Sequence, residues 1–190
     1  MVSILRREPS LAAAPDSVPT RADFRTLYDA HFSFVWRALQ HFGLSPAQAE
    51  DAAQEVFVTL HRRLDDYDAK TPIRAWLWGM SRHVALAERR KYARAERRDH
   101  VAKPPGASLP PDAALERQEA VDFVQDFLQS LPDELRDVFV MMEIEGMAAT
   151  EVAVALDAKP NTIYSRLRLA RTYFERAGAR LRAREERAAG

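Results

Sequence analysis

The chain has 190 residues, of which 47% are apolar, and its 28 basic side chains balance 28 acidic ones. This length and composition fit one medium domain or two small ones with a real hydrophobic core. Cysteine is absent, which excludes disulfides, thiolate zinc sites and cysteine nucleophiles. No apolar stretch approaches the roughly 18 residues of a membrane span, and no secretory signal is recognised, so we expect a cytoplasmic protein without membrane insertion.

The zero net charge conceals three charged blocks. Residues 82–98 hold seven basic and two acidic side chains, and residues 159–187 hold nine basic and three acidic ones. Between them, residues 112–151 hold eleven acidic and two basic ones. Two basic blocks on either side of an acidic one indicate two contacts with polyanions and a different role for the acidic block.

Apolar residues recur at helical spacing through the first half of the chain. They predict helices over residues 24–42 and from Pro46 onward, where Ser45 and Gln48 form a capping box, and a third helix after Pro72.

The second predicted helix has an unusual polar face. Asp51, Gln54 and Glu55 share it, and the helix carries no positive charge before Arg62. Solvated helices usually mix both signs, so this face predicts a basic partner. A merely solvated acidic face is the simpler alternative that the residues alone leave open.

The far end of the third predicted helix is the first basic block. Three aromatic residues, Tyr67, Trp76 and Trp78, precede it. Arginine and lysine follow a phosphate backbone, and an aromatic ring offers a surface on which an unpaired base stacks. For Trp76, burial in the core explains the residue equally well.

A proline-rich stretch divides the chain. Residues 103–112 read KPPGASLPPD, which no helix or sheet interior tolerates. We therefore predict a linker over 99–112 that reaches roughly 45 Å when extended. The predicted organisation is all-α: a flexible N-terminal arm, two small helical domains joined by this linker, and a basic tail, at residues 1–20, 21–98, 113–177 and 178–190.

The sequence TEVAVALDAKPNTIYSRLRLAR at residues 150–171 fits a helix-turn-helix. Asp157 stands in the turn, and Ile163, Leu167 and Ala170 are expected to face inward. Their burial leaves an outward set that suits groove reading, with amide and guanidinium groups for base edges and hydroxyls and further arginines for phosphates. The outward set is Asn161, Tyr164, Ser165, Arg166, Arg168 and Arg171. The alternative is a helical core with a solvated basic face.

Catalytic patterns are missing from the sequence. The histidines lack the spacing of a metal pair, no glycine-rich phosphate loop occurs, and the carboxylates fall on helix faces without a nucleophile beside them. We expect no catalytic residue, no metal and no cofactor.

Taken together, these segments resemble a bacterial RNA polymerase sigma factor of the extracytoplasmic-function (ECF) group over most of residues 22–177. AEDAAQEVF is similar to the segment with which that family docks on the polymerase clamp. TPIRAWLWGMSRHVA is similar to its −10 element segment, and LPDELRDVFVMMEIEGMAATEVAVAL with TIYSRLRLAR to its −35-reading domain.

The resemblance implies roles for the residues above. Asp51, Gln54 and Glu55 would meet basic residues on a coiled coil of the clamp in core RNA polymerase. The −35 duplex would be read by the outward set of the helix-turn-helix. The −10 DNA would be bound and opened by Tyr67, Lys70, Thr71, Trp76, Arg82, His83, Arg89, Arg90 and Lys91.

It also implies that the protein directs promoter-specific transcription initiation, performs no chemistry itself, and is regulated by an anti-sigma factor. Serine is common in the family where Ala148 stands, so we expect the first helix of the motif to start late, at Thr150. Two rivals remain: a helix-turn-helix repressor or activator that binds duplex without polymerase, and a sigma mimic that sequesters a regulator.

Overall fold

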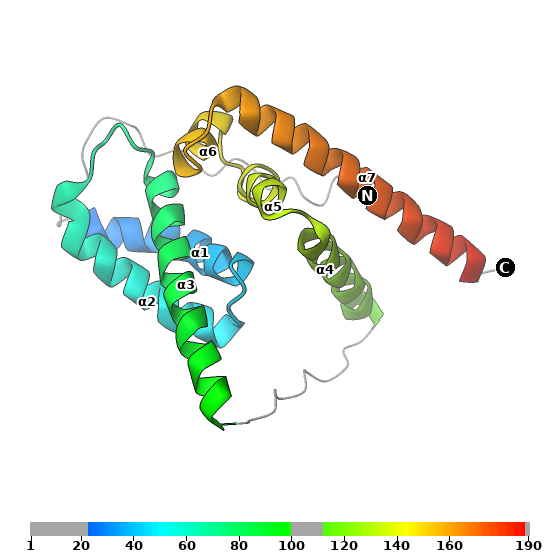
Figure 1. The fold of residues 1–190 in the computed structure, drawn as a ribbon, viewed down its shortest axis with the longest axis horizontal. Helices are drawn as coiled ribbons and strands as arrows, with labels where there is room; N and C mark the ends of the chain where they lie inside the picture. The colour runs from blue at the N-terminus through cyan, green and yellow to red at the C-terminus, as the bar shows by residue number, and fades with distance from the viewer. Residues whose placement is uncertain (1–22, 100–111, 189–190) are drawn as a thin grey trace.

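The computed structural model describes residues 23–99 and 112–188 (Figure 1). The predicted arm at 1–20 and nearly all of the predicted linker lie outside the described residues. Within those two ranges the chain forms helices and loops and no strand, which confirms the all-α prediction.

The first domain is built from α1 (Phe24–His41), α2 (Pro46–Arg63), a short 3-10 turn and α3 (Ile73–Asp99). The predicted capping box begins α2: Ser45 N–H donates to Gln48 Oε1 at 2.9 Å, and Gln48 N–H donates to Ser45 Oγ at 3.4 Å. Apolar side chains from all three helices fill the core, among them Val35, Leu39, Val56, Leu60, Leu77 and Trp78.

The second domain contains α4 (Asp112–Ser130), α5 (Asp133–Phe139), a π-helical turn at Val140–Ile144, α6 (Ala149–Ala155) and α7 (Pro160–Ala188). Arg136 ties α4 to α5, because its guanidinium donates to the carbonyl oxygens of Leu128 and Leu131 at 2.6 and 2.7 Å. α7 is continuous to Ala188, so the predicted basic tail is helical over most of its length and projects past the domain (Figure 1).

The expected late start of α6 is wrong. The helix begins at Ala149 rather than Thr150. Ala148 offers no side-chain oxygen, but Glu151 reaches back and its carboxylate accepts the Ala148 N–H at 2.8 Å. One half of a capping box is therefore enough to hold the first turn in place.

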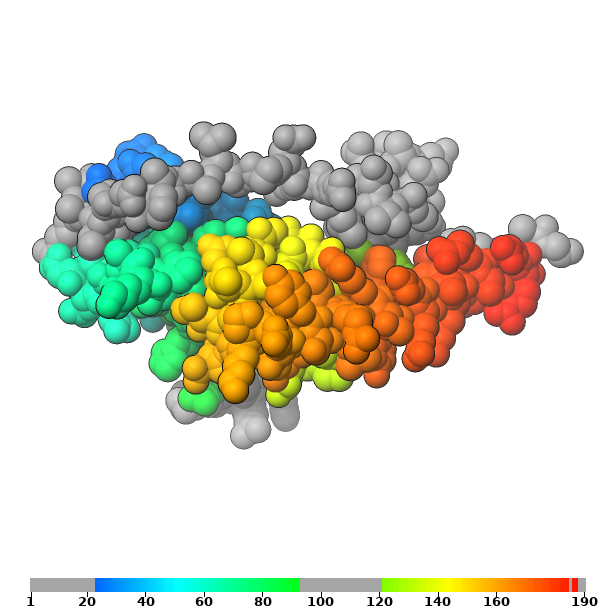
Figure 2. Space-filling view, turned by 90° about the horizontal axis from the view of Figure 1, so that it is seen from above, coloured from blue at the N-terminus to red at the C-terminus, as the bar shows by residue number. Residues whose placement is uncertain are grey.

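The two domains pack against each other. α3 lies against α6, and Figure 2 shows the surface of the second domain continuing directly onto that of the first. Residues from both domains form one hydrophobic cluster. α6, the first helix of the helix-turn-helix, therefore contacts α3, the helix that carries the first basic block.

Candidate functional site

The acidic face of α2 is exposed as predicted. Asp51, Gln54 and Glu55 are all accessible, while Ala52 and Val56 behind them are buried. Asp51 and Glu55 border a hollow of about 180 Å³ that Glu88 and Lys91 of α3 also line. The face thus presents carboxylates to solvent on a rigid two-helix base.

Lys91 lies beside these acids. Its Nζ is 3.3 Å from Glu88 Oε1, and the hydrogen bond to Glu88 raises the pKa of Lys91. The structure therefore places this predicted −10 residue at the edge of the acidic face and apart from the predicted aromatic residues.

The loop before α3 holds an aromatic pair. Tyr67 Oη donates to the carbonyl of Thr71 at 2.5 Å, and the Tyr67 ring lies 5.0 Å from the Trp76 ring. Asp68 fixes the turn, since its Oδ1 accepts the Lys70 N–H at 3.0 Å. Burial raises the pKa of Tyr67, so its hydroxyl remains a neutral donor. The result is a preformed, half-buried aromatic surface at one end of the domain.

Trp78 belongs to the core. It is 1% exposed and its ring packs against Phe34, His41 and Phe42. Trp76, two residues earlier, is only half-buried and faces Tyr67. Of the two tryptophans of α3, Trp76 is therefore the accessible one.

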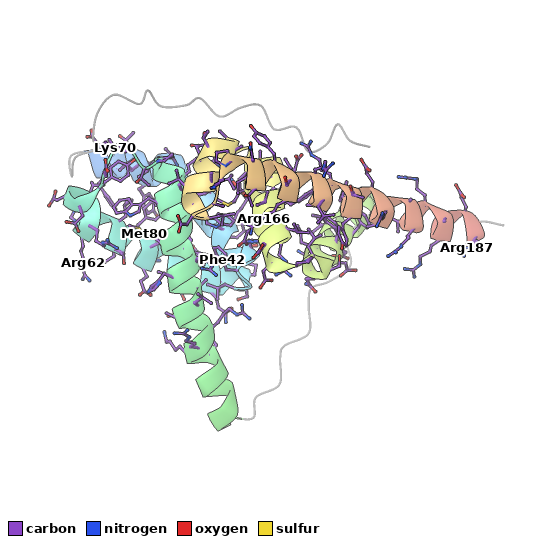
Figure 3. The ribbon with its side chains drawn as sticks, turned by 45° about the horizontal axis from the view of Figure 1, so that its top comes forward. Phe42, Arg62, Lys70, Met80, Arg166 and Arg187 are labelled. Atoms are coloured by element: carbon purple, nitrogen blue, oxygen red, sulfur yellow. The ribbon has the colours of Figure 1, made fainter. Side chains whose placement is uncertain are left out.

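The basic block of α3 is spread over several helix faces. Trp76, His83 and Arg90 are seven residues apart, which puts them on one face two turns from each other. Arg82 and Arg89 share a second face, and Arg89 approaches the Phe42 carbonyl at 3.5 Å. Lys70 is exposed in the preceding loop at the far end of this domain, as labelled in Figure 3.

The helix-turn-helix is present as predicted. Asp157 takes a left-handed conformation with φ of 47° at the turn. Ile163, Leu167 and Ala170 are buried, with exposed fractions of 0%, 5% and 0%, and α7 packs on both α5 and α6. The predicted inward side chains thus fix the orientation of α7.

The outward set divides into two groups. Asn161, Tyr164, Ser165 and Arg168 are exposed, and Tyr164 has 58% of its surface accessible. The other two arginines are held by acids. Arg166 forms an ion pair with Glu134, and Arg171 Nε donates to Glu143 Oε1 at 2.9 Å.

Arg168 differs from both neighbours. In the described part of the chain it has no carboxylate partner, so its guanidinium reaches solvent without first leaving an ion pair. Sequence reasoning missed the ion pairs of Arg166 and Arg171, since their partners lie 32 and 28 residues away.

A polar cluster between the domains was also missed. Glu145, whose side chain is 1% exposed, accepts hydrogen bonds from Arg37 at 2.7 and 2.6 Å. Arg74 donates to the Glu145 carbonyl at 2.7 Å, and His41 Nε2 lies 2.8 Å from Asp137 Oδ1. Partners separated by 71 to 108 residues leave no periodic pattern that would reveal them.

His31 lies near Arg74 of this cluster, and its surroundings predict that the stability of the fold depends on pH. Burial lowers its pKa from the ordinary value of 6.5, and the charge of Arg74 lowers it further. Well above pH 6.5 the side chain is neutral in both states and makes the free energy of unfolding no more dependent on pH. Below it the unfolded chain binds the proton first, so we expect the free energy of unfolding to fall by up to about 1.4 kcal/mol per pH unit.

The measurement is thermal or urea unfolding between pH 7.5 and 5. His31→Gln should flatten the slope below pH 6.5. His83→Gln, at an exposed position, is the matched histidine replacement for comparison. Parallel curves for wild type and His31→Gln would contradict the assignment.

No group of three metal-binding side chains occurs among the residues that the structure describes. Over the same residues, no helix has the length and apolar character needed to cross a bilayer.

Both halves of the chain match known protein families. Residues 27–95 match the family Sigma-70 region 2, and residues 124–173 match Sigma-70, region 4. The ECF RNA polymerase sigma factor SigL of Mycobacterium tuberculosis is 30% identical over 151 residues, which are 77% of this chain and 83% of that protein. The chain belongs to the ECF sigma factors.

Other similar proteins support the assignment to this family. The RNA polymerase sigma-H factor of Pseudomonas aeruginosa is 26% identical over 145 residues, covering 68% of this sigma factor and 72% of the relative. CnrH, solved in complex with the cytosolic domain of CnrY, superposes with a TM-score of 0.61 at 26% identity, covering 86% and 90% of the two chains. RpoE of Bartonella quintana shares the fold, with a TM-score of 0.61 and 18% identity over 82% and 96%.

The family membership fixes the general activity. This sigma factor binds core RNA polymerase and promoter DNA and directs promoter-specific transcription initiation.

Proposed function

We propose that the sigma factor docks on core RNA polymerase through the acidic face of α2, opens −10 DNA with the first domain and reads −35 duplex with α7. The domains that do so span residues 21–98 and 113–177. The observation that carries the proposal is the presence, on one chain, of an exposed acidic helix, a preformed aromatic pair and an ordered helix-turn-helix.

The polymerase contact is assigned to Asp51, Gln54 and Glu55. Their side chains point away from a core that includes Ala52, Ala53 and Val56, so docking requires no rearrangement of α2. Carboxylates facing basic residues would orient the encounter and raise the association rate.

The −10 contact is assigned to the Tyr67–Thr71 loop and to the face of α3 with Trp76, His83 and Arg90. A flipped base needs an aromatic surface to replace its lost stacking, and the Tyr67 and Trp76 rings supply one. Lys70, Arg82 and Arg89 are exposed around it, where cations would meet phosphates. Lys91, held by Glu88, contributes least in this arrangement.

The −35 contact is assigned to the exposed part of α7. Asn161 and Arg168 carry the groups that read base edges, and Ser165 and Tyr164 carry hydroxyls that suit phosphates. Arg166 and Arg171 would join the contact only after leaving Glu134 and Glu143.

The sigma factor itself catalyses no reaction in this proposal, because the polymerase makes the phosphodiester bonds. Its place of action is the cytoplasm, where polymerase and chromosome meet. An anti-sigma factor is a further proposed partner. Its support is that the CnrH structure contains the cytosolic domain of CnrY and the Bartonella RpoE structure contains the anti-sigma factor NepR.

In vitro run-off transcription with purified core enzyme, followed by mapping of RNA start sites, tests the proposal. We expect promoter-specific transcripts only when both components are present. A gel-shift assay is the control: tight promoter binding by the sigma factor alone would identify a repressor or activator instead. A sigma mimic would show no DNA binding and therefore no dependence on salt.

A further inference from the structure

α7 continues well beyond the helix-turn-helix. The match to Sigma-70, region 4 ends at residue 173, whereas the helix runs on to Ala188 and projects past α4 and α5 (Figure 1). The first turns of this extension, residues 174–188, pack on the domain, since the Phe174 ring lies 5.0 Å from that of Phe127. Beyond Leu181, every side chain that the structure describes is exposed. The end of α7 therefore presents its surface to solvent.

Four arginines share one face of the extension. They follow one another at intervals of four, four and three residues, which places them within an arc of about 80° around the helix. All are exposed, and none has a carboxylate partner among the side chains that the structure describes. We call this set the arginine stripe: Arg176, Arg180, Arg184 and Arg187.

The arginine stripe works against the stability of its own helix. Arg180 stands four residues from Arg176 and four from Arg184, and like charges at this spacing repel each other across one helical turn. Cations are favourable near a helix C-terminus, but that effect is confined to the last turn, where Arg187 lies. The position of the other three arginines is therefore best explained by an anionic partner.

The charge of the extension is one-sided. Glu175, Arg182 and Glu186 are exposed on the far side of the helix from the arginine stripe. One arginine against two glutamates gives that side a negative balance, while the arginine stripe carries four positive charges. An anionic partner would therefore meet the extension along a single line.

The arginine stripe lies about a quarter-turn around α7 from the side chains assigned to −35 reading. Asn161, Ser165 and Arg168 define the reading face, and the small residues Ala179 and Ala183 lie on its straight continuation. A helix in the major groove turns one face to the base edges and its flanks to the sugar–phosphate walls. When the reading face meets the bases, the arginine stripe is turned toward one of these walls.

We propose that the arginine stripe binds the phosphates of one DNA strand beside the −35 element and so extends the promoter contact beyond the helix-turn-helix. This inference rests on the proposed function, because α7 must lie in the −35 groove to bring the arginines to the duplex. The guanidinium fork matches phosphate oxygens, and contacts of this kind add affinity without reading sequence. From Arg176 to Arg187 the arginine stripe spans about 16 Å along the helix axis.

The salt dependence of promoter binding by the assembled holoenzyme tests the proposal. The variant replaces all four arginines of the stripe with glutamine, which has a similar helix propensity. The slope of log affinity against log salt should become less steep by about 0.9 for each lost phosphate contact, and by about 3.6 in all. Raising the salt from about 50 to about 200 mM should then cost the wild type roughly 100-fold more affinity than the variant.

Two single variants form a matched pair. Arg180→Gln and Arg182→Gln remove the same charge two residues apart, one on the arginine stripe and one on the far side of the helix. We expect Arg180→Gln to change the slope by about 0.9 and Arg182→Gln to leave it near the wild-type value. Circular dichroism should show unchanged helix content in every variant.

Phosphate ethylation interference locates the contact. We expect ethylated phosphates beside the −35 element to impair binding of the wild-type holoenzyme and to have no effect on the fourfold variant. Equal salt slopes for the wild type and the fourfold variant, or equal changes in Arg180→Gln and Arg182→Gln, would overturn the proposal. A wild-type holoenzyme whose binding ignores the −35 element would instead refute the proposed function of α7.

Discussion

Reversing the charge of Asp51 and Glu55 to lysine should weaken binding to core RNA polymerase by about 100-fold or more, because close charge pairs at interfaces are worth at least about 1.5 kcal/mol each. Both carboxylates are exposed on α2, where they border the hollow that Lys91 of α3 also lines. Their replacement therefore changes the docking surface and spares the core. The measurement is the equilibrium affinity for fluorescently labelled core enzyme at fixed salt.

A control variant with the same change in net charge separates the effect of where the charges are reversed from the effect of the total charge. Asp29→Lys with Asp66→Lys alters two exposed acids of the first domain that lie off the α2 face. We expect this control to bind core enzyme within a few-fold of the wild type. Equal losses in both double variants would mean that long-range charge, and no local contact, governs docking.

Replacing Arg168 by alanine should lower transcription from cognate promoters by about 5- to 150-fold, since one good bidentate contact to a base is worth about 1 to 3 kcal/mol. Arg168 is exposed on the outward face of α7, and the described residues offer it no competing carboxylate. The measurement is run-off transcription from templates with the natural and the scrambled −35 element.

Arg171→Ala is the matched comparison on the same helix. Its guanidinium is engaged by Glu143, so contact with DNA requires that bond to break and the net contribution is smaller. We expect a smaller defect than for Arg168→Ala. The defect of Arg168→Ala should disappear on the scrambled template, and an identical loss on both templates would show that the residue does not read the −35 sequence.

The features that sequence predicted are those fixed by neighbours in the chain. The Ser45 capping box and the left-handed turn at Asp157 each depend on residues within a few positions, and both are found where expected. The inward stripe of Ile163 and Leu167 follows from helical period alone. Local chemistry therefore fixed the helices and the orientation of α7.

The features that sequence missed depend on partners far along the chain. Arg166 and Arg171 look like free DNA-binding residues in the sequence. Packing of α5 on α7 brings Glu134 beside Arg166, and the π-helical turn after α5 places Glu143 beside Arg171. Glu145 looks like one acid among many in the acidic block. Its ion pairs form only because the fold brings arginines of α1 and α3 to it from 108 and 71 residues away.

The covalent connection between the two domains determines how their packing responds to protein abundance. Two surfaces joined in one chain meet at an effective concentration on the order of millimolar. Dilution therefore does not separate α3 from α6, whereas a contact of the same strength between two separate molecules would weaken as the protein is diluted.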